Sequence, residues 1–281
     1  MYHVNTFINT DKAVASYERR MSICLQSNGF SFSVTTASGL FLAFGEVSMD
    51  LRQPMSSLIA DIKSFFSEQQ IYPVEFRSMR LAVDSDSYVW VPAALYNASQ
   101  QRRYLEAVAP VPVSQMASSS FHAALDAHLV FTVDATVLTA FKVALPGIEC
   151  CANPSALLGD TLLQRSKQHP VVVAWLTSDE HPQQMAVDYL VLRNGGLLLS
   201  TRRHVDNAQS LLYTSLNVMK RMEVETPDME MLLCGAVDRD LFMQLRGYFP
   251  HLDLYNGAAL QPQQPQLARL HAYKYATVLS D

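Results

Sequence analysis

The chain has 281 residues, of which 49% are hydrophobic and 17% are charged, so it is long enough to bury one or two cores. Its formal net charge is −5 and its basic pairs are dispersed, which argues against binding to nucleic acid or to an anionic membrane surface. No stretch reaches the roughly 18 apolar residues of a membrane span, and the N-terminus lacks a signal-peptide pattern. These features predict a cytoplasmic protein.

The first half opens with a predicted three-strand antiparallel meander. Its strands cover residues 21–26, 30–36 and 40–47. Asn28-Gly29 and Ser38-Gly39 lie between them, and such pairs are typical of tight hairpins, which need positive φ angles. A helix is predicted over residues 54–70, because five apolar residues share one helical face. These residues are Leu58, Ile59, Ile62, Phe65 and Phe66.

The rest of the first half alternates between strands and helices. Strands are predicted over residues 74–83, 127–133 and 148–152, and residues 88–96 lead into a helix over 100–109. Residues 110–120 are rich in proline and serine and predict a loop. A helix is predicted from Asp134 to Pro146-Gly147. Asn153-Pro154 is typical of a helix start, so a further helix is predicted over 155–168.

The same order of elements restarts at Pro170. Strands are predicted over residues 171–177, 184–193 and 196–204, joined by turns at 178–183 and at Asn194-Gly195-Gly196. A helix begins at Asp206, with Leu211, Leu212, Leu216 and Met219 on its core side. The remaining elements are a strand at 229–235, a helix at 238–249, a strand at 251–255 and, after a Gln/Pro linker, a C-terminal helical segment.

A meander followed by crossover units therefore occurs twice. This order describes the duplicated ribonuclease-H-like architecture of actin-like ATPases, an α/β fold in which each lobe is a three-strand meander with crossover helices. We assign residues 1–168 to the first lobe and 169–281 to the second.

The segment "PVVVAWLTSDEHPQQMAVDYLVLRNGGLLLSTRRHVDNAQSLL" resembles the actin-like proteins that help assemble type IV pili and type II secretion machines. Asn194, Gly195, Leu197 and Arg202 occupy comparable places, and "VALPGIECCANPSALLGDTLL" is similar to the segment by which that group enters its second lobe. The first half, with "MSICLQSNGFSFSV" and "VWVPAALY", is similar to a bacterial family known only as a domain of unknown function with an actin-like ATPase fold.

The resemblance implies three nucleotide loops. Glycines and an acidic residue after the first strand of each lobe would hold magnesium and wrap the phosphates, and a glycine turn before a late helix would contact the adenosine. Glycine suits such turns because a side chain blocks the close approach of a phosphate to backbone amides. A carboxylate is needed because phosphoryl transfer depends on charge neutralisation through the metal.

At the first of these places the chain has Ser27, Asn28 and Gly29, with no carboxylate, and a tight hairpin is the alternative interpretation. At the second it has Ser178, Asp179 and Glu180, with acids but no glycine, and a solvated turn is the alternative. The third place, Gly235-Ala236, fits a helix start open to an anion or a base, although a glycine at such a junction is common. Together these eight residues are our candidate for a vestigial nucleotide cleft, which would take ATP or ADP with magnesium.

No catalytic residue and no metal ligand is assigned. The chain has no Gly-x-Ser-x-Gly elbow, Walker loop or His-Glu-x-x-His motif, and its eight histidines are scattered. The four cysteines lie in apolar, strand-like segments without metal-ligand spacing, and we expect buried free thiols in a reducing compartment. They are Cys24, Cys150, Cys151 and Cys234.

Three functional hypotheses follow. The first is a catalytically degenerate scaffold or regulatory adaptor that binds a protein partner, with residual nucleotide affinity. Aromatic residues near element ends, at residues 90–92 and 247–255, are candidates for a partner surface. The second is a working ATPase or small-molecule kinase, with Asp179 or Glu180 as the metal carboxylate. The third is an enzyme of another α/β fold.

Overall fold

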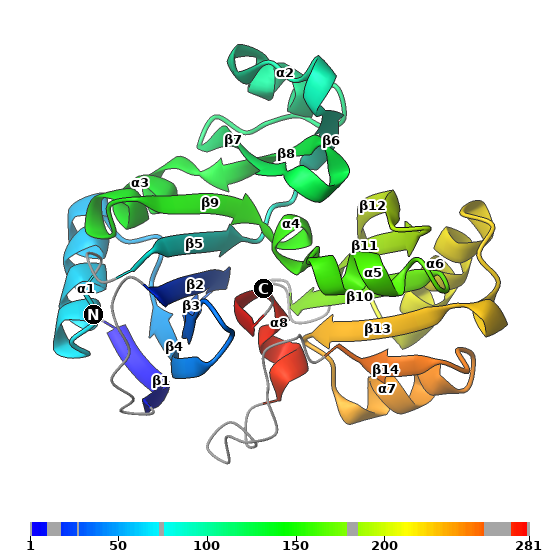
Figure 1. The fold of residues 1–281 in the computed structure, drawn as a ribbon. Helices are drawn as coiled ribbons and strands as arrows, with labels where there is room; N and C mark the ends of the chain where they lie inside the picture. The colour runs from blue at the N-terminus through cyan, green and yellow to red at the C-terminus, as the bar shows by residue number, and fades with distance from the viewer. Residues whose placement is uncertain are drawn as a thin grey trace. The chain divides into compact units, whose positions relative to one another are not determined.

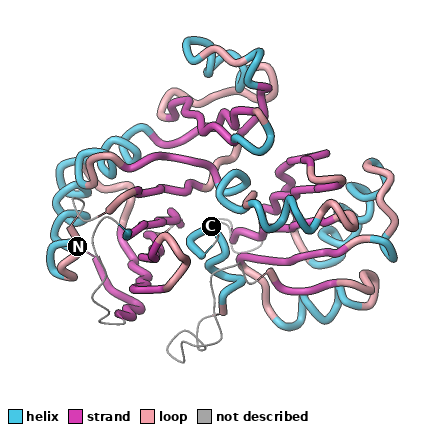
Figure 2. The backbone as a smooth tube through the Cα atoms, viewed as in Figure 1, coloured by secondary structure: helices cyan, strands magenta, loops and turns pink. Residues whose placement is uncertain are grey.

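The protein is represented by a computed structural model that describes residues 2–9, 18–26, 28–72, 76–178, 185–255 and 271–279. The chain divides into two compact units, Met1–Ala156 and Leu157–Asp281, and each is an α/β unit. Figures 1 and 2 show a sheet with helices against it in each unit. None of the helices in the described ranges is long and apolar enough to cross a membrane.

The first unit is built on a six-stranded sheet with the order β1-β4-β3-β2-β5-β9. The strands are β1 (Tyr2–Asn9), β2 (Arg19–Gln26), β3 (Gly29–Thr36), β4 (Phe41–Met49), β5 (Ser78–Val83) and β9 (Ile148–Ala152). Strands β2, β3 and β4 form the predicted antiparallel meander, and β5 runs parallel to β2 and β9 parallel to β5. Strand β1 was not predicted; it pairs antiparallel with the outer side of β4.

Two helices cover one face of this sheet, α1 (Met55–Glu68) and α3 (Ala135–Ala144). The predicted apolar face of α1 is confirmed, because four of its five residues are buried and the fifth, Ile59, is partly buried. Phe30 of β3 ties both helices to the sheet, with its ring centroid 5.6 Å from those of Phe65 and Phe141. Edge-to-face contacts of this kind add to the stabilisation that comes from burial.

A second, three-stranded sheet is inserted between β5 and α3, with the order β6-β8-β7. The strands are β6 (Tyr88–Pro92), β7 (Gln115–His122) and β8 (Ala127–Asp134), and α2 (Gln101–Glu106) precedes β7. Residues 115–120 were predicted as a loop, and this was wrong: they form most of β7, paired along its length with β8. One face of the inserted sheet joins the core of the unit, and the other packs on Leu105 of α2.

The second unit has a five-stranded sheet with the order β12-β11-β10-β13-β14. The strands are β10 (Val171–Ser178), β11 (Met185–Arg193), β12 (Gly196–Val205), β13 (Glu230–Gly235) and β14 (Leu252–Leu254). Strands β10, β11 and β12 are antiparallel, and β13 and β14 continue the sheet in parallel. The predicted turn at Asn194-Gly195 is confirmed, and both residues have positive φ angles, 56° and 77°.

The remaining elements are short or cover this sheet. The α-helices are α4 (Asn153–Leu157), α5 (Asp160–Arg165), α6 (Ala208–Arg221), α7 (Arg239–Arg246) and α8 (Ala276–Leu279). The 3-10 turns are η3 (Ala93–Leu95), η4 (Ala98–Gln100), η5 (Ala123–Leu125), η6 (Thr226–Asp228) and η7 (Ala272–Tyr275). The single helix predicted over 155–168 is instead two, α4 and α5, which Leu158 and Gly159 separate.

Helix α6 begins one residue later than predicted, because its N-cap is Asn207 rather than Asp206. The Asn207 side chain accepts from the amide of Ser210, and the Ser210 hydroxyl accepts from the amide of Asn207. Leu216 was predicted on the core side of this helix and is 38% exposed, so that prediction was wrong. Ser215 and Val218 lie on the buried side instead.

The two units share one strand order. Strands β4-β3-β2-β5-β9 of the first unit correspond to β12-β11-β10-β13-β14 of the second. In each series the first and fourth strands are joined through a helix, α1 or α6. A meander whose first strand pairs in parallel with the fourth is the ribonuclease-H-like arrangement. The predicted fold class, a duplicated actin-like α/β fold, is therefore confirmed.

The core of the second unit contains one neutral hydrogen bond whose loss should be measurable. The hydroxyl oxygens of Tyr189 and Ser215 are 2.7 Å apart, and both residues are fully buried. Replacing Tyr189→Phe leaves the Ser215 hydroxyl without this partner, so we expect the free energy of unfolding to fall by about 1–3 kcal/mol. Urea denaturation measures this change. The double variant Tyr189→Phe/Ser215→Ala removes both groups and should recover most of the loss; no recovery would contradict the assigned hydrogen bond.

Candidate functional site

The predicted nucleotide positions fall at strand ends in both units. Asn28 and Gly29 lie at the β2–β3 turn of the first unit, and Ser27 lies outside the described residues. Ser178 ends β10 in the second unit, whereas Asp179 and Glu180 lie outside the described residues, so the acidic turn stays a prediction. Gly235 ends β13, which runs parallel to β10, so Ser178 and Gly235 share the carboxyl edge of one sheet.

Gly29 is held tightly between strands. Its φ angle is +149°, and a Cβ atom placed on it would lie 1.9 Å from the carbonyl oxygen of Val47 in β4. The amide of Met49 donates to the carbonyl of the neighbouring Asn28 at 2.8 Å. The β2–β3 turn is therefore fastened to the end of β4, and this contact alone requires glycine at position 29.

Gly235 is held in the same way against β10. Its φ angle is +85°, and a Cβ atom there would lie 2.0 Å from the carbonyl oxygen of Leu176. The amide of Ala236 donates to that same Leu176 carbonyl at 2.8 Å, and the amide of Val237 donates to the carbonyl of Gly235 at 2.8 Å. Two successive amides at this junction thus have backbone acceptors.

The helix that follows Gly235 carries its own anion at its start. Asp238 is the N-cap of α7, and its carboxylate accepts from the amide of Leu241 at 2.7 Å. Asp240 adds a second carboxylate in the first turn. Acidic side chains at this position complement the positive end of the helix dipole and occupy the place an external anion would take.

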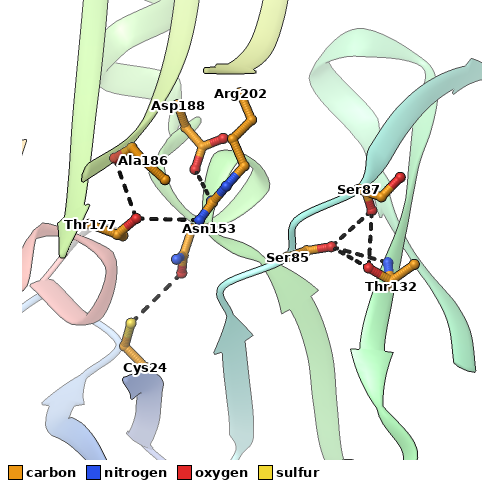
Figure 3. Close-up of polar contacts among 9 residues, drawn as sticks. All are labelled: Cys24, Ser85, Ser87, Thr132, Asn153, Thr177, Ala186, Asp188 and Arg202. Atoms are coloured by element: carbon orange, nitrogen blue, oxygen red, sulfur yellow. Dashed lines mark hydrogen bonds and ion pairs between the residues drawn. The ribbon is translucent and has the colours of Figure 1, made fainter. Parts of the chain in front are cut away.

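A buried ion pair spans the meander of the second unit (Figure 3). Arg202 of β12 donates from Nη1 to Oδ2 of Asp188 on β11 at 2.7 Å, and their side chains are 8% and 1% exposed. Its Nη2 also donates to Oγ1 of Thr177 on β10 at 3.3 Å. The cluster links three adjacent strands. Because side chains alternate between the two faces of a strand, the cluster lies on the face opposite the buried Val187 and Tyr189.

The resemblance had drawn attention to Arg202, but sequence reasoning missed Asp188 and Thr177. The available signal was a single carboxylate inside the apolar strand "MAVDYLVLR", since a charge in a strand buried on both faces needs a partner. The register that pairs Asp188 with Arg202 identifies that partner.

Polar groups also gather at the carboxyl edge of the parallel strands in the first unit, where open α/β sheets place their ligands (Figure 3). The Cys24 thiol of β2 donates to Oδ1 of Asn153, the residue after β9, at 3.7 Å. Ser85, just after β5, is 3.1 Å from the hydroxyl of Thr132. These groups are short, uncharged and hydrogen-bonded to one another, so they hold elements together without supplying a charge.

The cysteines are free, as predicted. Cys24, Cys151 and Cys234 are buried, and Cys150 is partly buried. Burial raises the pKa of the Cys151 thiol to about 11 and raises the pKa of Cys234 well above its ordinary value. Thiols in such surroundings are protonated near neutral pH and are poor nucleophiles. In the described part of the chain, no group of three or more His, Cys, Asp or Glu residues could hold a metal ion.

The strand order of the two units defines the class: this is a protein with an actin-like ATPase fold. A solved structure from Bacteroides thetaiotaomicron, described as a protein with actin-like ATPase fold and unknown function, supports the assignment. It is 18% identical, with a TM-score of 0.69 over 86% of this chain and 92% of that chain. The chain belongs to the family described as proteins of unknown function (DUF3822), whose model matches residues 9–252. The predicted resemblance is therefore confirmed.

Two further solved structures have lower TM-scores, and no curated protein matches the sequence. The ethanolamine utilization protein EutJ from Carboxydothermus hydrogenoformans is 11% identical, with a TM-score of 0.42 over 94% of this chain and 90% of that chain. The Ppx/GppA phosphatase of Aquifex aeolicus is 11% identical, with a TM-score of 0.38 over 83% of this chain and 72% of that chain. At these scores neither similarity carries an argument about activity.

Proposed function

We propose that this protein is an actin-like scaffold or adaptor that binds a protein partner and does not hydrolyse nucleotide. The observation that carries the proposal is the junction at Gly235, where the glycine is required by contact with Leu176 and the next two amides donate to backbone carbonyls. A phosphate cradle needs free amides at a glycine turn. This junction does not fit a phosphate group, one of the two ligands expected for it; its contact with an adenosine stays a prediction.

Electrostatics support the same conclusion. The start of α7 carries Asp238 and Asp240, and a phosphate placed there would be repelled by both carboxylates. At the first turn, Gly29 is packed on β4 and the described neighbour, Asn28, brings no charge. The two described loops therefore offer the phosphates of a nucleotide no cradle, and residual nucleotide binding would depend on Asp179 and Glu180.

A partner role is supported by exposed apolar side chains in the inserted sheet and its loops. Leu95, Val113 and Phe121 are 71%, 98% and 54% exposed. The aromatic residues that first suggested a partner surface are mostly core: Phe249 is buried, Trp90 packs against the core, and Tyr248 is exposed. Exposed apolar groups collected in one inserted element are typical of a protein-binding surface.

The proposal keeps three predictions from the sequence. We propose a cytoplasmic location, because the free buried thiols suit a reducing compartment. We propose no nucleic-acid partner, because the net charge is −5. We also propose that the lobes of the fold are residues 1–168 and 169–281.

Thermal unfolding of the full chain with and without millimolar Mg-ATP or Mg-ADP tests the proposal. A ligand at about a hundred times its dissociation constant adds about 2.7 kcal/mol of stability, which raises the Tm of a protein of this size by about 5 °C or more. We expect a change of less than about 1 °C with either nucleotide.

The matched control is the double variant Asp179→Asn/Glu180→Gln, which removes the carboxylates of the predicted acidic turn. A nucleotide-specific rise in the wild-type Tm that the double variant loses would contradict the proposal. It would favour the alternative, an ATPase or small-molecule kinase that uses this turn as its metal site.

A further inference from the structure

Strand β12 lies at the edge of the second sheet. It pairs with β11 on one side, and no strand in the described ranges pairs with its other side. The corresponding strand of the first unit, β4, pairs with β3 on one side and with β1 on the other. Because the two units share one strand order, β1 shows what this edge position accepts: an extended segment running antiparallel.

The edge of β12 is long enough to bind such a segment. It has ten residues, Gly196–Val205, without proline or lysine, and a bulge at Leu198 leaves the seven residues from Leu199 to Val205 as its regular part. An edge of this length presents a row of backbone donors and acceptors that can form a new ladder. The Arg203 side chain lies along the backbone here, with Nη1 donating to the carbonyl of Arg202 at 3.3 Å.

The chemistry of the edge differs between its two ends. Residues Leu197, Leu198 and Leu199 make the first end apolar, and Leu198 is 42% exposed. Arg203 and His204 are exposed at the other end. In a chain of net charge −5, the guanidinium of Arg203 makes this end cationic, beside an apolar end.

We propose that the outer edge of β12 binds an extended segment of a partner protein, antiparallel to β12, with acidic residues first and β-branched apolar residues after them. Antiparallel pairing places the start of the segment beside Arg203 and its end beside Leu199, next to the bulged and exposed Leu198. Cross-strand pairs of opposite charge and of apolar side chains then match along the ladder. This inference rests on the proposed scaffold function and adds a second partner surface to that of the inserted sheet.

The probe is a fluorescein-labelled synthetic peptide, Glu-Glu-Ser-Thr-Thr-Val-Val-Ile, titrated with the full chain and followed by fluorescence anisotropy. We expect saturable binding that the double variant Leu198→Lys/Arg203→Glu weakens at least tenfold. The matched control is Leu216→Lys/Arg221→Glu, which makes the same changes on exposed positions of α6 and should leave the Kd within twofold. Circular dichroism verifies that both variants are folded.

Peptides with N-methyl groups on alternate residues separate strand pairing from other binding modes. Only every second amide of an added strand faces β12. Methylation of the amides that face β12 should therefore abolish binding, whereas methylation of the other set should leave the Kd within about threefold. Three results would each overturn the inference: the two sets of methylated peptides bind equally, the two protein variants weaken binding equally, or the unmodified peptide does not bind.

Sedimentation equilibrium tests whether a second copy of the chain, rather than a partner protein, pairs with the edge of β12. A dimer that the Leu198→Lys/Arg203→Glu variant dissociates would show that a second copy of the chain takes this edge, and would also overturn the inference. None of these outcomes affects the test of nucleotide binding, because that test measures the change in Tm with Mg-ATP or Mg-ADP. Failure at β12 is therefore distinguishable from failure of the scaffold proposal.

Discussion

Replacing Gly235→Ala is expected to lower the free energy of unfolding by about 3 kcal/mol or more. The added Cβ would lie 2.0 Å from the carbonyl oxygen of Leu176, which belongs to the backbone of the central strand β10. The φ angle of +85° adds strain for any residue with a side chain. Urea denaturation with a matched Tm measurement gives the loss.

Gly195→Ala is the control in the same unit. Its φ angle of +77° is similar, but the nearest atoms to the added Cβ belong to the flexible Lys167 side chain, at 3.0 Å or more. We expect this variant to lose only about 1 kcal/mol, the cost of a left-handed conformation. Equal losses for the two variants would show that the contact with Leu176 does not determine the need for glycine.

This prediction also determines which substitutions can show where a nucleotide binds. A bulky residue at Gly235 would disturb the contact between β13 and β10 whether or not a nucleotide binds there. Loss of a ligand effect in such a variant would therefore say little about the ligand. Asp179 and Glu180 are the better positions, because substitution by their amides preserves shape while removing charge.

Replacing Asp188→Ala is expected to destabilise the protein by about 3–5 kcal/mol, because it leaves the guanidinium of Arg202 buried without this carboxylate. The pair is joined at 2.7 Å, and the two side chains are 8% and 1% exposed. Arg202→Ala should cost a similar amount, since it leaves the carboxylate of Asp188 buried instead. Denaturant unfolding of both single variants measures these losses.

Two controls show whether the loss of stability comes from leaving a charge buried. The double variant Asp188→Leu/Arg202→Met replaces the ion pair with apolar groups and should recover most of the loss, because no charge stays buried. Glu106→Ala breaks an exposed ion pair with Arg102 at 2.8 Å and should change stability by less than about 0.5 kcal/mol. A loss below about 1 kcal/mol for Asp188→Ala would contradict a structural role for the pair.

The fold was predictable because its turns carry local signals. Asn28-Gly29 and Asn194-Gly195 mark the two hairpins, and the apolar face of α1 follows the helical period. Strand β1 was missed because "YHVNTFIN" mixes polar and apolar residues on an edge, and its partner β4 lies far along the chain. Strand β7 was missed because its serines have a low intrinsic preference for strands. It forms because it pairs along its length with β8.

The site was predictable only in part. The sequence places a glycine at 235, yet the reason for it is an atomic contact with Leu176, a residue almost sixty positions earlier in the chain. A turn that binds phosphate and a turn that packs on a neighbouring strand both require glycine. The ion pair is similar: Asp188 stands out in an apolar strand, whereas Arg202 lies among polar residues, and only the register of β11 and β12 pairs them.

The measurement that tests the account most directly is steady-state phosphate release from Mg-ATP by the purified full chain, beside the Asp179→Asn/Glu180→Gln variant. If the protein is a scaffold that does not hydrolyse nucleotide, wild-type release should be indistinguishable from that of the variant and from buffer. Release several-fold above background that disappears in the double variant would contradict the account, and would show that this actin-like fold hydrolyses nucleotide through its acidic turn.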